Sequence, residues 1–152
     1  NDVLLEVLEE YKKQGQEFEF ACCIYPTAPF VSAEKLKKAM GELENSDADT
    51  LIPVVPFSYP PQRGLLIAEN GCLVRQFPEY ATARSQDLPK VYHDCGQFYA
   101  CRTKPFMEAG TTDVENLIPL ILSEMEVQDI DTPEDWEIAE IKYRRLFSND
   151  TD

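Results

Sequence analysis

The sequence predicts an α/β domain whose sheet is mostly parallel. Two short apolar runs, residues 18–25 and 50–55, have the continuous hydrophobicity of strands that are buried on both faces. Between them an amphipathic helix is predicted to begin after Ser32 and to carry apolar residues at helical spacing as far as Leu43. A strand, a helix and a strand joined by short connections indicate a right-handed parallel βαβ unit.

The other elements follow from local patterns. Residues 2–14 are predicted to form a helix that ends at Gly15, and prolines punctuate residues 56–90, where the Asn70-Gly71 pair predicts a hairpin turn. Further expected elements are a strand at 96–102, a short helix at 104–109, an irregular or edge strand at 117–122 and a last helix at about 133–147. We expect residues 1–147 to be the C-terminal part of a single domain, with 56–90 as an insertion and 148–152 as a tail.

Composition excludes several classes of protein. The chain has 152 residues, of which 43% are hydrophobic, so it can form one folded domain with a core. Its formal net charge of −14 argues against a nucleic-acid or anionic-membrane surface. The five cysteines lack metal-ligand spacing and indicate reduced thiols in the cytoplasm. No apolar run approaches the length of a membrane span.

Two aspartates near the C-terminal end stand two positions apart, in the run Val127-Gln128-Asp129-Ile130-Asp131-Thr132-Pro133. In an extended segment Asp129 and Asp131 point to the same side, and their hard oxygens suit Mg²⁺ beside a phosphate. The structural alternative is a helix N-terminus with Thr132 as the cap and Pro133 in the first helical position. The two interpretations are compatible.

Four blocks together resemble the CMP-sialic-acid synthetase (acylneuraminate cytidylyltransferase) family, and within it the pseudaminic acid branch. Each block is a weak signal alone, but the four in this order are specific. They are 23–30 (Cys-Ile-Tyr-Pro-Thr-Ala-Pro-Phe), 83–89 (Ala-Arg-Ser-Gln-Asp-Leu-Pro), 92–99 (Tyr-His-Asp-Cys-Gly-Gln-Phe-Tyr) and 128–136 (Gln-Asp-Ile-Asp-Thr-Pro-Glu-Asp-Trp).

The resemblance implies a Rossmann-like nucleotide-diphospho-sugar transferase fold, here an incomplete three-layer sandwich with an inserted β-hairpin. It also implies an enzyme that joins CTP to a nine-carbon acidic sugar and releases pyrophosphate, for bacterial flagellin or surface glycans. Asp129 and Asp131 would bind Mg²⁺ and serve as the catalytic residues, one of them helping to remove the proton of the sugar hydroxyl. Homodimers are expected, with residues 56–90 contributing to the interface.

Further site residues come from the same resemblance. It implies nucleotide contacts by Pro26, Thr27 and Ala28, and sugar contacts by Arg84, Gln86, Gly96 and Gln97. Simpler alternatives remain open: a Pro-rich connector for the first set and a solvated surface arginine in the second. The lone histidine, His93, is not assigned as a general base, since a single histidine is more often structural.

Some family features differ or are missing. Sialic acid enzymes usually have Gln and Ser where this chain has Tyr25 and Ala28, and usually Asn and a small residue at Asp94 and Gln97, which indicates a different sugar. The family's basic loop that cradles the CTP phosphates, Ala-Arg-Gly-Gly-Ser-Lys, has no counterpart here. We therefore expect the chain alone to be weakly active or inactive. The alternatives are a cytidylyltransferase for legionaminic acid, sialic acid or Kdo, and a non-catalytic sugar- or nucleotide-binding or dimerisation module.

Overall fold

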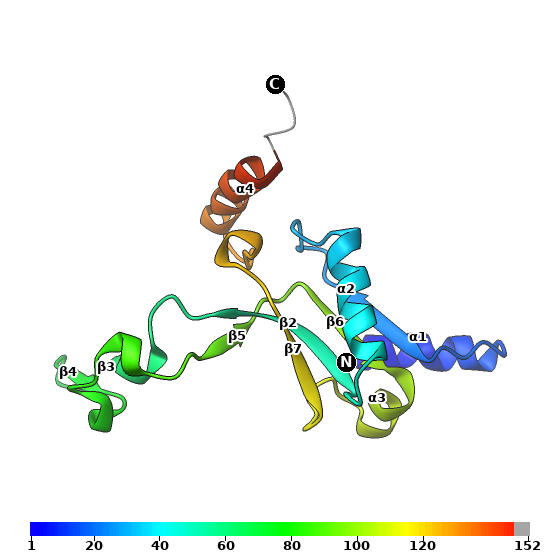
Figure 1. The fold of residues 1–152 in the computed structure, drawn as a ribbon, viewed down its shortest axis with the longest axis horizontal. Helices are drawn as coiled ribbons and strands as arrows, with labels where there is room; N and C mark the ends of the chain where they lie inside the picture. Colours follow the sequence, from blue (N-terminus) through cyan, green and yellow to red (C-terminus); the bar gives the residue numbers. More distant parts are fainter. Residues whose placement is uncertain (148–152) are drawn as a thin grey trace.

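A five-stranded sheet forms the centre of the computed structural model, which describes residues 1–147 (Figure 1). The tail predicted at 148–152 lies outside the described residues. The strands are β1 (Phe20–Ile24), β2 (Thr50–Pro56), β5 (Tyr92–Asp94), β6 (Phe98–Arg102) and β7 (Leu117–Ile121). One edge of β2 pairs with β7, and its other edge pairs first with β6 and then with β5. β1 pairs with the far edge of β6.

The expectation of a mostly parallel sheet is wrong for this part of the chain. Only the β2–β7 pairing is parallel, whereas β1–β6, β2–β6 and β2–β5 are antiparallel. β1 and β2 do run in the same direction, as a βαβ unit requires, but β6 is inserted between them. The apolar pattern reports that a strand is buried and carries no information about which strand lies beside it.

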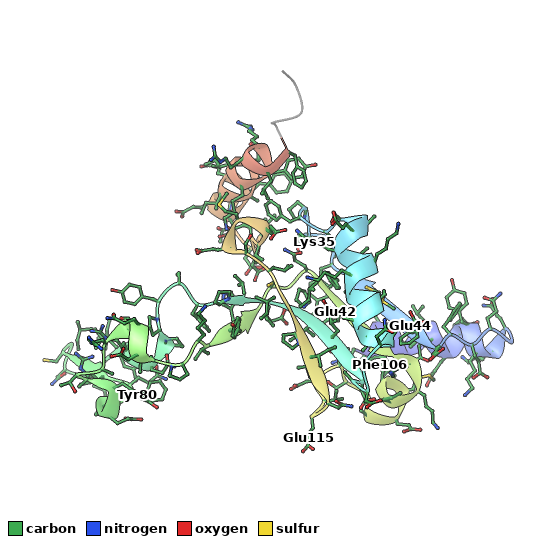
Figure 2. The ribbon with its side chains drawn as sticks, in the orientation of Figure 1. Lys35, Glu42, Glu44, Tyr80, Phe106 and Glu115 are labelled. Atoms are coloured by element: carbon green, nitrogen blue, oxygen red, sulfur yellow. The ribbon has the colours of Figure 1, made fainter. Side chains whose placement is uncertain are left out.

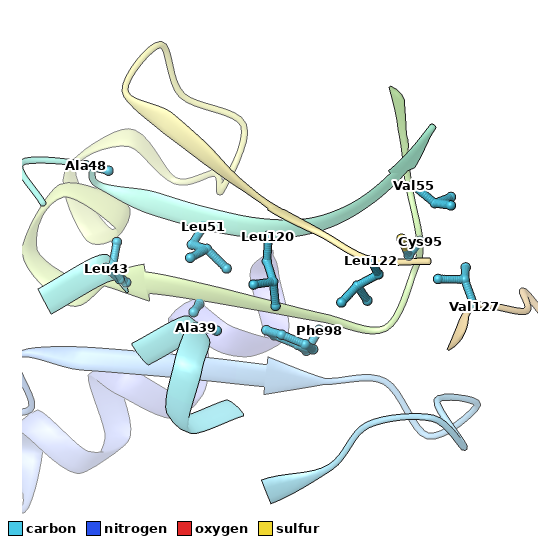
Figure 3. Packing of buried hydrophobic residues seen from close by; sticks show 11 residues of the cluster. Ala39, Leu43, Ala48, Leu51, Val55, Cys95, Phe98, Leu120, Leu122 and Val127 are labelled. Carbon is cyan, nitrogen blue, oxygen red and sulfur yellow. The ribbon is translucent and has the colours of Figure 1, made fainter. Parts of the chain in front are cut away.

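Helices cover both faces of the sheet and make three layers. They are α2 (Ala33–Glu44) on one face and α1 (Asp2–Lys13) and α3 (Thr103–Ala109) on the other, whereas α4 (Pro133–Phe147) stands beyond the sheet (Figure 1). Successive side chains of β1 alternate between the faces: Phe20 and Cys22 pack in the core beneath α2, and Ala21 packs in the core with α1 and α3. Figure 3 shows the larger core, where residues of α2 meet β2, β6 and β7. Within the described residues no helix is long and apolar enough to cross a membrane.

The start of α2 forms as the sequence predicts, and its end has a partner from β6. The side chain of Ser32 accepts a hydrogen bond from the backbone N–H of Lys35 at 3.2 Å and caps α2. At the other end of α2, Arg102 of β6 donates to the carbonyl oxygens of Leu43, Ser46 and Ala48 at 3.0–3.1 Å. Because the last turn of α2 has no basic residue of its own, this guanidinium complements the partial negative charge there.

An arm, residues 57–91, leaves the sheet between β2 and β5 (Figure 1). It carries the predicted hairpin, which is confirmed as β3 (Leu65–Ile67) paired antiparallel with β4 (Leu73–Arg75). Short 3₁₀ turns complete it: η1 (Pro61–Arg63), η2 (Pro78–Tyr80) and η3 (Ser85–Asp87). Apolar side chains on this arm are widely exposed, among them Tyr59 at 75% and Ile67 at 77%.

Candidate functional site

Three of the four motif blocks border the two cavities that meet at Asp94, at the end of β5. This residue borders a cavity of about 290 Å³ that Asp129 and His93 also line. It also borders a cavity of about 690 Å³ on the α1 side of the sheet, together with Tyr25 and Tyr99. Residues far apart in sequence are therefore brought to one place, as expected for a binding cleft at the ends of strands.

Both oxygens of the Asp94 carboxylate have protein partners. One accepts the backbone N–H of Gly96 at 2.8 Å, and the other accepts the phenolic hydroxyl of Tyr99. Burial, followed by the hydrogen bond and negative charge of Asp94, raises the pKa of Tyr99 well above its ordinary value. Tyr99 therefore stays protonated and acts as a hydrogen-bond donor, and its ring lies 5.3 Å from that of Tyr25.

Gly96 brings the β5–β6 junction close to Asp129. Its φ of +62° lies in the left-handed region that favours glycine. A Cβ at this position would lie 3.7 Å from Oδ1 of Asp129. The backbone of the third motif block thus packs beside a carboxylate of the fourth.

Gln97 is buried and links the sheet to the C-terminal segment. It is 1% exposed, and its Nε2 donates to the carbonyl oxygen of Glu126 at 2.6 Å. Its Oε1 is buried without a hydrogen-bond partner among the described residues. In this structure the side chain therefore positions residues near Asp129, and the sugar contact predicted for Gln97 stays a prediction.

The contacts of the acidic segment, residues 127–132, show which of its residues cap α4 and which remain available to bind a metal. It is not a strand and follows a 3₁₀ turn, η4 (Glu124–Glu126). The helix cap belongs to Thr132 and Asp135: the Thr132 hydroxyl accepts the N–H of Asp135 at 3.3 Å, and the Asp135 carboxylate accepts the N–H of Thr132 at 2.9 Å. The Thr132 hydroxyl also donates to the Asp135 carboxylate, at 2.7 Å. This bond first, and then the bond from the Thr132 N–H, lowers the pKa of Asp135.

The carboxylates of Asp129 and Asp131 are left available. Both residues are exposed, and neither carboxylate accepts a hydrogen bond or forms an ion pair within residues 1–147. The described chain contains no group of three or more His, Cys, Asp or Glu side chains that could hold a metal. Two free carboxylates nevertheless fit Mg²⁺, which keeps several waters and takes its remaining ligands from substrate phosphates.

A half-buried ion pair holds the turn before the acidic segment. The ammonium of Lys35 lies 3.0 Å from the Glu126 carboxylate and donates to the carbonyl oxygen of Phe30 at 2.8 Å. Figure 2 shows Lys35 on the side of α2 that faces this turn. Burial alone would raise the pKa of Glu126, but hydrogen bonds from Ser123 and Lys35 outweigh it, and the pKa is lowered.

The predicted nucleotide loop lies against the C-terminal segment. Pro26, Thr27 and Ala28 line a third cavity, of about 430 Å³, together with Ile130 of the acidic segment and Trp136 of α4. Ile130 and Asp129 therefore line different cavities, and Asp131 lines neither of these two, so the prediction that both aspartates face one site stays a prediction.

Arg84 and Gln86 lie apart from this cleft. They belong to the arm and line neither of the cavities that Asp94 borders. The guanidinium of Arg84 forms a bidentate pair with Asp87, with distances of 2.7 and 3.2 Å. Figure 2 places Tyr80, on the same arm, far from Lys35. One chain by itself does not bring the predicted sugar-carboxylate contact to the predicted metal ligands.

Sequence reasoning did not single out three residues that shape the site. Tyr99 stands in the third motif block without a role assigned to it. Strand alternation places it on the same face of β6 as Cys101 and on the opposite face from Phe98. Lys35 and Lys142 look like solvent-exposed cations of amphipathic helices. No sequence signal distinguishes them, because their partners are mostly backbone carbonyl groups and, for Lys35, the carboxylate of Glu126, a residue far away in sequence.

Comparison with known proteins identifies relatives with a shared name. No family model matches the chain. It is 32% identical over 142 residues to the pseudaminic acid cytidylyltransferase of Campylobacter jejuni subsp. jejuni serotype O:2, and 33% identical over 137 residues to that of serotype O:23/36. These matches cover 93% and 90% of this chain but only 61% and 59% of the relatives. The chain is a homologue of these cytidylyltransferases.

Two further comparisons agree with this relationship. A Helicobacter pylori protein named pseudaminic acid cytidylyltransferase and UDP-2,4-diacetamido-2,4,6-trideoxy-beta-L-altropyranose hydrolase is 34% identical over 130 residues, which are 85% of this chain and 24% of that protein. A solved structure of CMP:2-keto-3-deoxy-manno-octonic acid synthetase complexed with CTP superposes with a TM-score of 0.55. It is 12% identical and covers 97% of this chain and 68% of its own, so it supports the fold. The resemblance to the family is confirmed over most of the chain.

Proposed function

We propose that this chain acts in the transfer of a cytidylyl group from CTP to a nine-carbon acidic sugar, pseudaminic acid or a close relative, with release of pyrophosphate. The observation that carries the proposal is the meeting of two motif blocks at one cavity, where Asp94 and Asp129 both lie beside Gly96: Asp94 accepts its N–H at 2.8 Å, and a Cβ at this position would lie 3.7 Å from Oδ1 of Asp129. The names of the relatives support the same reaction. The chain spans about 60% of their length, so activity is expected for the protein extended to that length.

In this reaction the anomeric hydroxyl oxygen of the sugar attacks the α-phosphorus of CTP, and the bond from phosphorus to the pyrophosphate oxygen breaks. Asp129 and Asp131 would hold a divalent metal, Mg²⁺, since their carboxylates are exposed and unpaired within the described chain. Bound Mg²⁺ neutralises charge on the nucleotide phosphates. The chain's own part is to position the reactants, with an aspartate of this segment accepting the proton of the hydroxyl.

The sugar would occupy the cavity of about 690 Å³. Its walls combine apolar side chains with a polar end at Asp94, Tyr99 and Tyr25 and with further polar residues, Asn1, Thr111, Thr112 and Asp113. Apolar walls suit methyl and acyl groups, and a carboxylate beside a phenol suits sugar hydroxyl or amide groups. Gly96, at the edge of this polar end, would let the backbone approach the sugar, and the loop of Pro26, Thr27 and Ala28 would contact the nucleotide.

A homodimer would account for the arm. Arg84 and Gln86 cannot serve the cleft of their own chain in this arrangement, but the arm could carry them to the cleft of a second copy. Its exposed apolar side chains, such as Ile67 and Tyr59, suit a surface that becomes buried on association. Arg84 would then exchange Asp87 for the carboxylate of the sugar, a bidentate pairing that a guanidinium favours.

The test is pyrophosphate release from CTP, Mg²⁺ and pseudaminic acid, with legionaminic acid, sialic acid and Kdo as competing substrates. This chain is compared with a version extended upstream in its reading frame to the relatives' length, and both are tested with and without Asp131→Asn. Turnover of pseudaminic acid in the longer protein, lost in the variant, is the expected result.

Other outcomes lead to different conclusions. Faster turnover of another acid would change the substrate. No turnover of any acid by a folded, extended protein would favour the alternative, a non-catalytic sugar- or nucleotide-binding or dimerisation module. A cytoplasmic location, predicted from the thiols, is checked by fractionation of the producing cells.

A further inference from the structure

Lys142, in the middle of α4, makes three hydrogen bonds to the residues that precede the predicted metal ligands. Its ammonium donates to the carbonyl oxygens of Glu124 at 3.0 Å and Val127 at 2.6 Å, and to Oε1 of Gln128 at 3.0 Å. An ammonium has three N–H donors, so each of them is used. All three acceptors are uncharged, and no carboxylate of the described residues lies within ion-pair distance of Lys142.

The bond to Gln128 continues into the helix cap. With its oxygen held by Lys142, the Gln128 amide directs Nε2 to the carbonyl oxygen of Asp129 at 3.1 Å and to Oδ1 of Asp135 at 3.3 Å. The other oxygen of Asp135 accepts the N–H groups of Asp131 and Thr132. One ammonium therefore fixes the backbone on both sides of Asp129 and, through Gln128 and Asp135, the backbone at Asp131.

Apolar burial contributes only part of what holds α4 in place. Ala139 is its only fully buried residue, Tyr143 packs beside Phe30 with 6.3 Å between ring centroids, and Ile141, next to Lys142, is 67% exposed. A helix with so little apolar burial gains its position from specific polar contacts at its start and at Lys142. The same contacts set the position of the acidic segment relative to the helix.

We propose that Lys142 is a positioning residue for the metal site of Asp129 and Asp131, a role that rests on the proposed function. Its side chain lines the cavity that Asp129 borders, but its three donors are occupied by protein acceptors. It acts by holding the chain from which both carboxylates project, so that they can share one cation. A variant without these donors still contains both aspartates, but the backbone that carries them loses the hydrogen bonds that hold it.

The test compares Lys142→Met with Arg145→Met, a matched loss of a cation at an exposed position of the same helix. Mn²⁺ is the probe, followed by paramagnetic resonance, and amide hydrogen exchange reports on residues 124–131. Lys142→Met is expected to weaken Mn²⁺ binding about 10-fold, as loss of the groups that orient metal ligands does, and to speed exchange in 124–131. Arg145→Met should change neither, and Lys142→Arg should restore part of both.

Other results separate this proposal from the metal site itself. Unchanged exchange in 124–131, or faster exchange with unchanged Mn²⁺ affinity, overturns the role of Lys142. An equal effect of Arg145→Met also overturns it, because the effect would then be one of net charge. Mn²⁺ binding that Asp131→Asn leaves intact overturns instead the metal site on which the proposed function relies.

Discussion

Substitutions at Asp131 and Thr132 should separate the stability of α4 from the chemistry of the acidic segment. These residues are adjacent, yet the structure gives them different partners. The Thr132 hydroxyl bonds to the backbone N–H and the carboxylate of Asp135, whereas the carboxylate of Asp131 accepts no hydrogen bond from the described residues. The N–H of Asp131, which bonds to Asp135, would survive in Asp131→Asn.

The expected magnitudes follow from these contacts. Thr132→Ala removes a side-chain cap and should lower the stability of the helix by about 1 kcal/mol. That change raises the frayed population of α4 roughly 5-fold. Asp131→Asn keeps the backbone bond and removes only an exposed, unpaired carboxylate, so it should change stability by less than about 0.5 kcal/mol. Metal binding should show the opposite order, with a large loss for Asp131→Asn and a small one for Thr132→Ala.

Amide exchange within α4 measures the first effect, and titration with Mn²⁺ measures the second on the same samples. Asp129→Asn is the companion variant and should behave like Asp131→Asn. If Asp131→Asn frays the helix as much as Thr132→Ala does and leaves Mn²⁺ affinity unchanged, the aspartate is a capping residue and the reasoning fails.

Three further predictions test the structure around the site. Arg102→Met should lower the free energy of unfolding, measured in urea, by about 3 kcal/mol, because three carbonyl groups at and just after the end of α2 lose their charged donor. A loss below about 1 kcal/mol would show that water replaces the guanidinium. Gly96→Ala should cost about 1 kcal/mol because of its positive φ, whereas Gly41→Ala, in α2 with open space around it, should stabilise by about 0.5–1 kcal/mol. The pKa of Glu126 is lower in the folded protein than its ordinary value of 4.5. Its carboxylate should therefore stabilise the fold at pH values above 4.5, and this stabilisation should be lost as the pH falls through the pKa of the folded state. Urea unfolding at a series of pH values should show this loss in the wild type and not in Glu126→Gln.

Local features of the fold were predictable because they depend on neighbours in sequence. The Ser32 cap, the end of α1 near Gly15 and the hairpin around Asn70-Gly71 each follow from the conformational preference of one or two residues. The edge position of β7 follows from Pro119 in the same way. The order of strands was not predictable, since β6 reaches its place between β1 and β2 by pairings across about 50 to 80 residues.

The same distinction applies to the site. The motif blocks predicted which segments would matter, and three of them border the cavities around Asp94 and the acidic segment. Their internal roles were less predictable. Gln97 reads as a polar residue available to a substrate, but it is buried against the carbonyl group of Glu126, a residue 29 positions away. Such side-chain-to-backbone contacts leave no mark in the sequence, because every residue offers a carbonyl group.

The net charge of the chain bears on which groups would bind the substrate phosphates. A cytidylyltransferase must hold a triphosphate, yet the formal net charge here is −14. Arg144, which lines the cavity of Ile130 and the predicted nucleotide loop, is paired with Glu140 at 2.8 Å. Lys35 and Lys142 bond to residues in or next to the acidic segment, and both ammonium groups already have protein acceptors. Neither can turn to a phosphate without releasing the segment that it holds. Positive charge for the phosphates would therefore come from elsewhere: from the part by which the relatives exceed this chain, or from the arm of a second copy, where Arg84 is 71% exposed. An extended protein that turns over as a monomer, with Arg84→Met fully active, would leave the additional length of the relatives as the sole source.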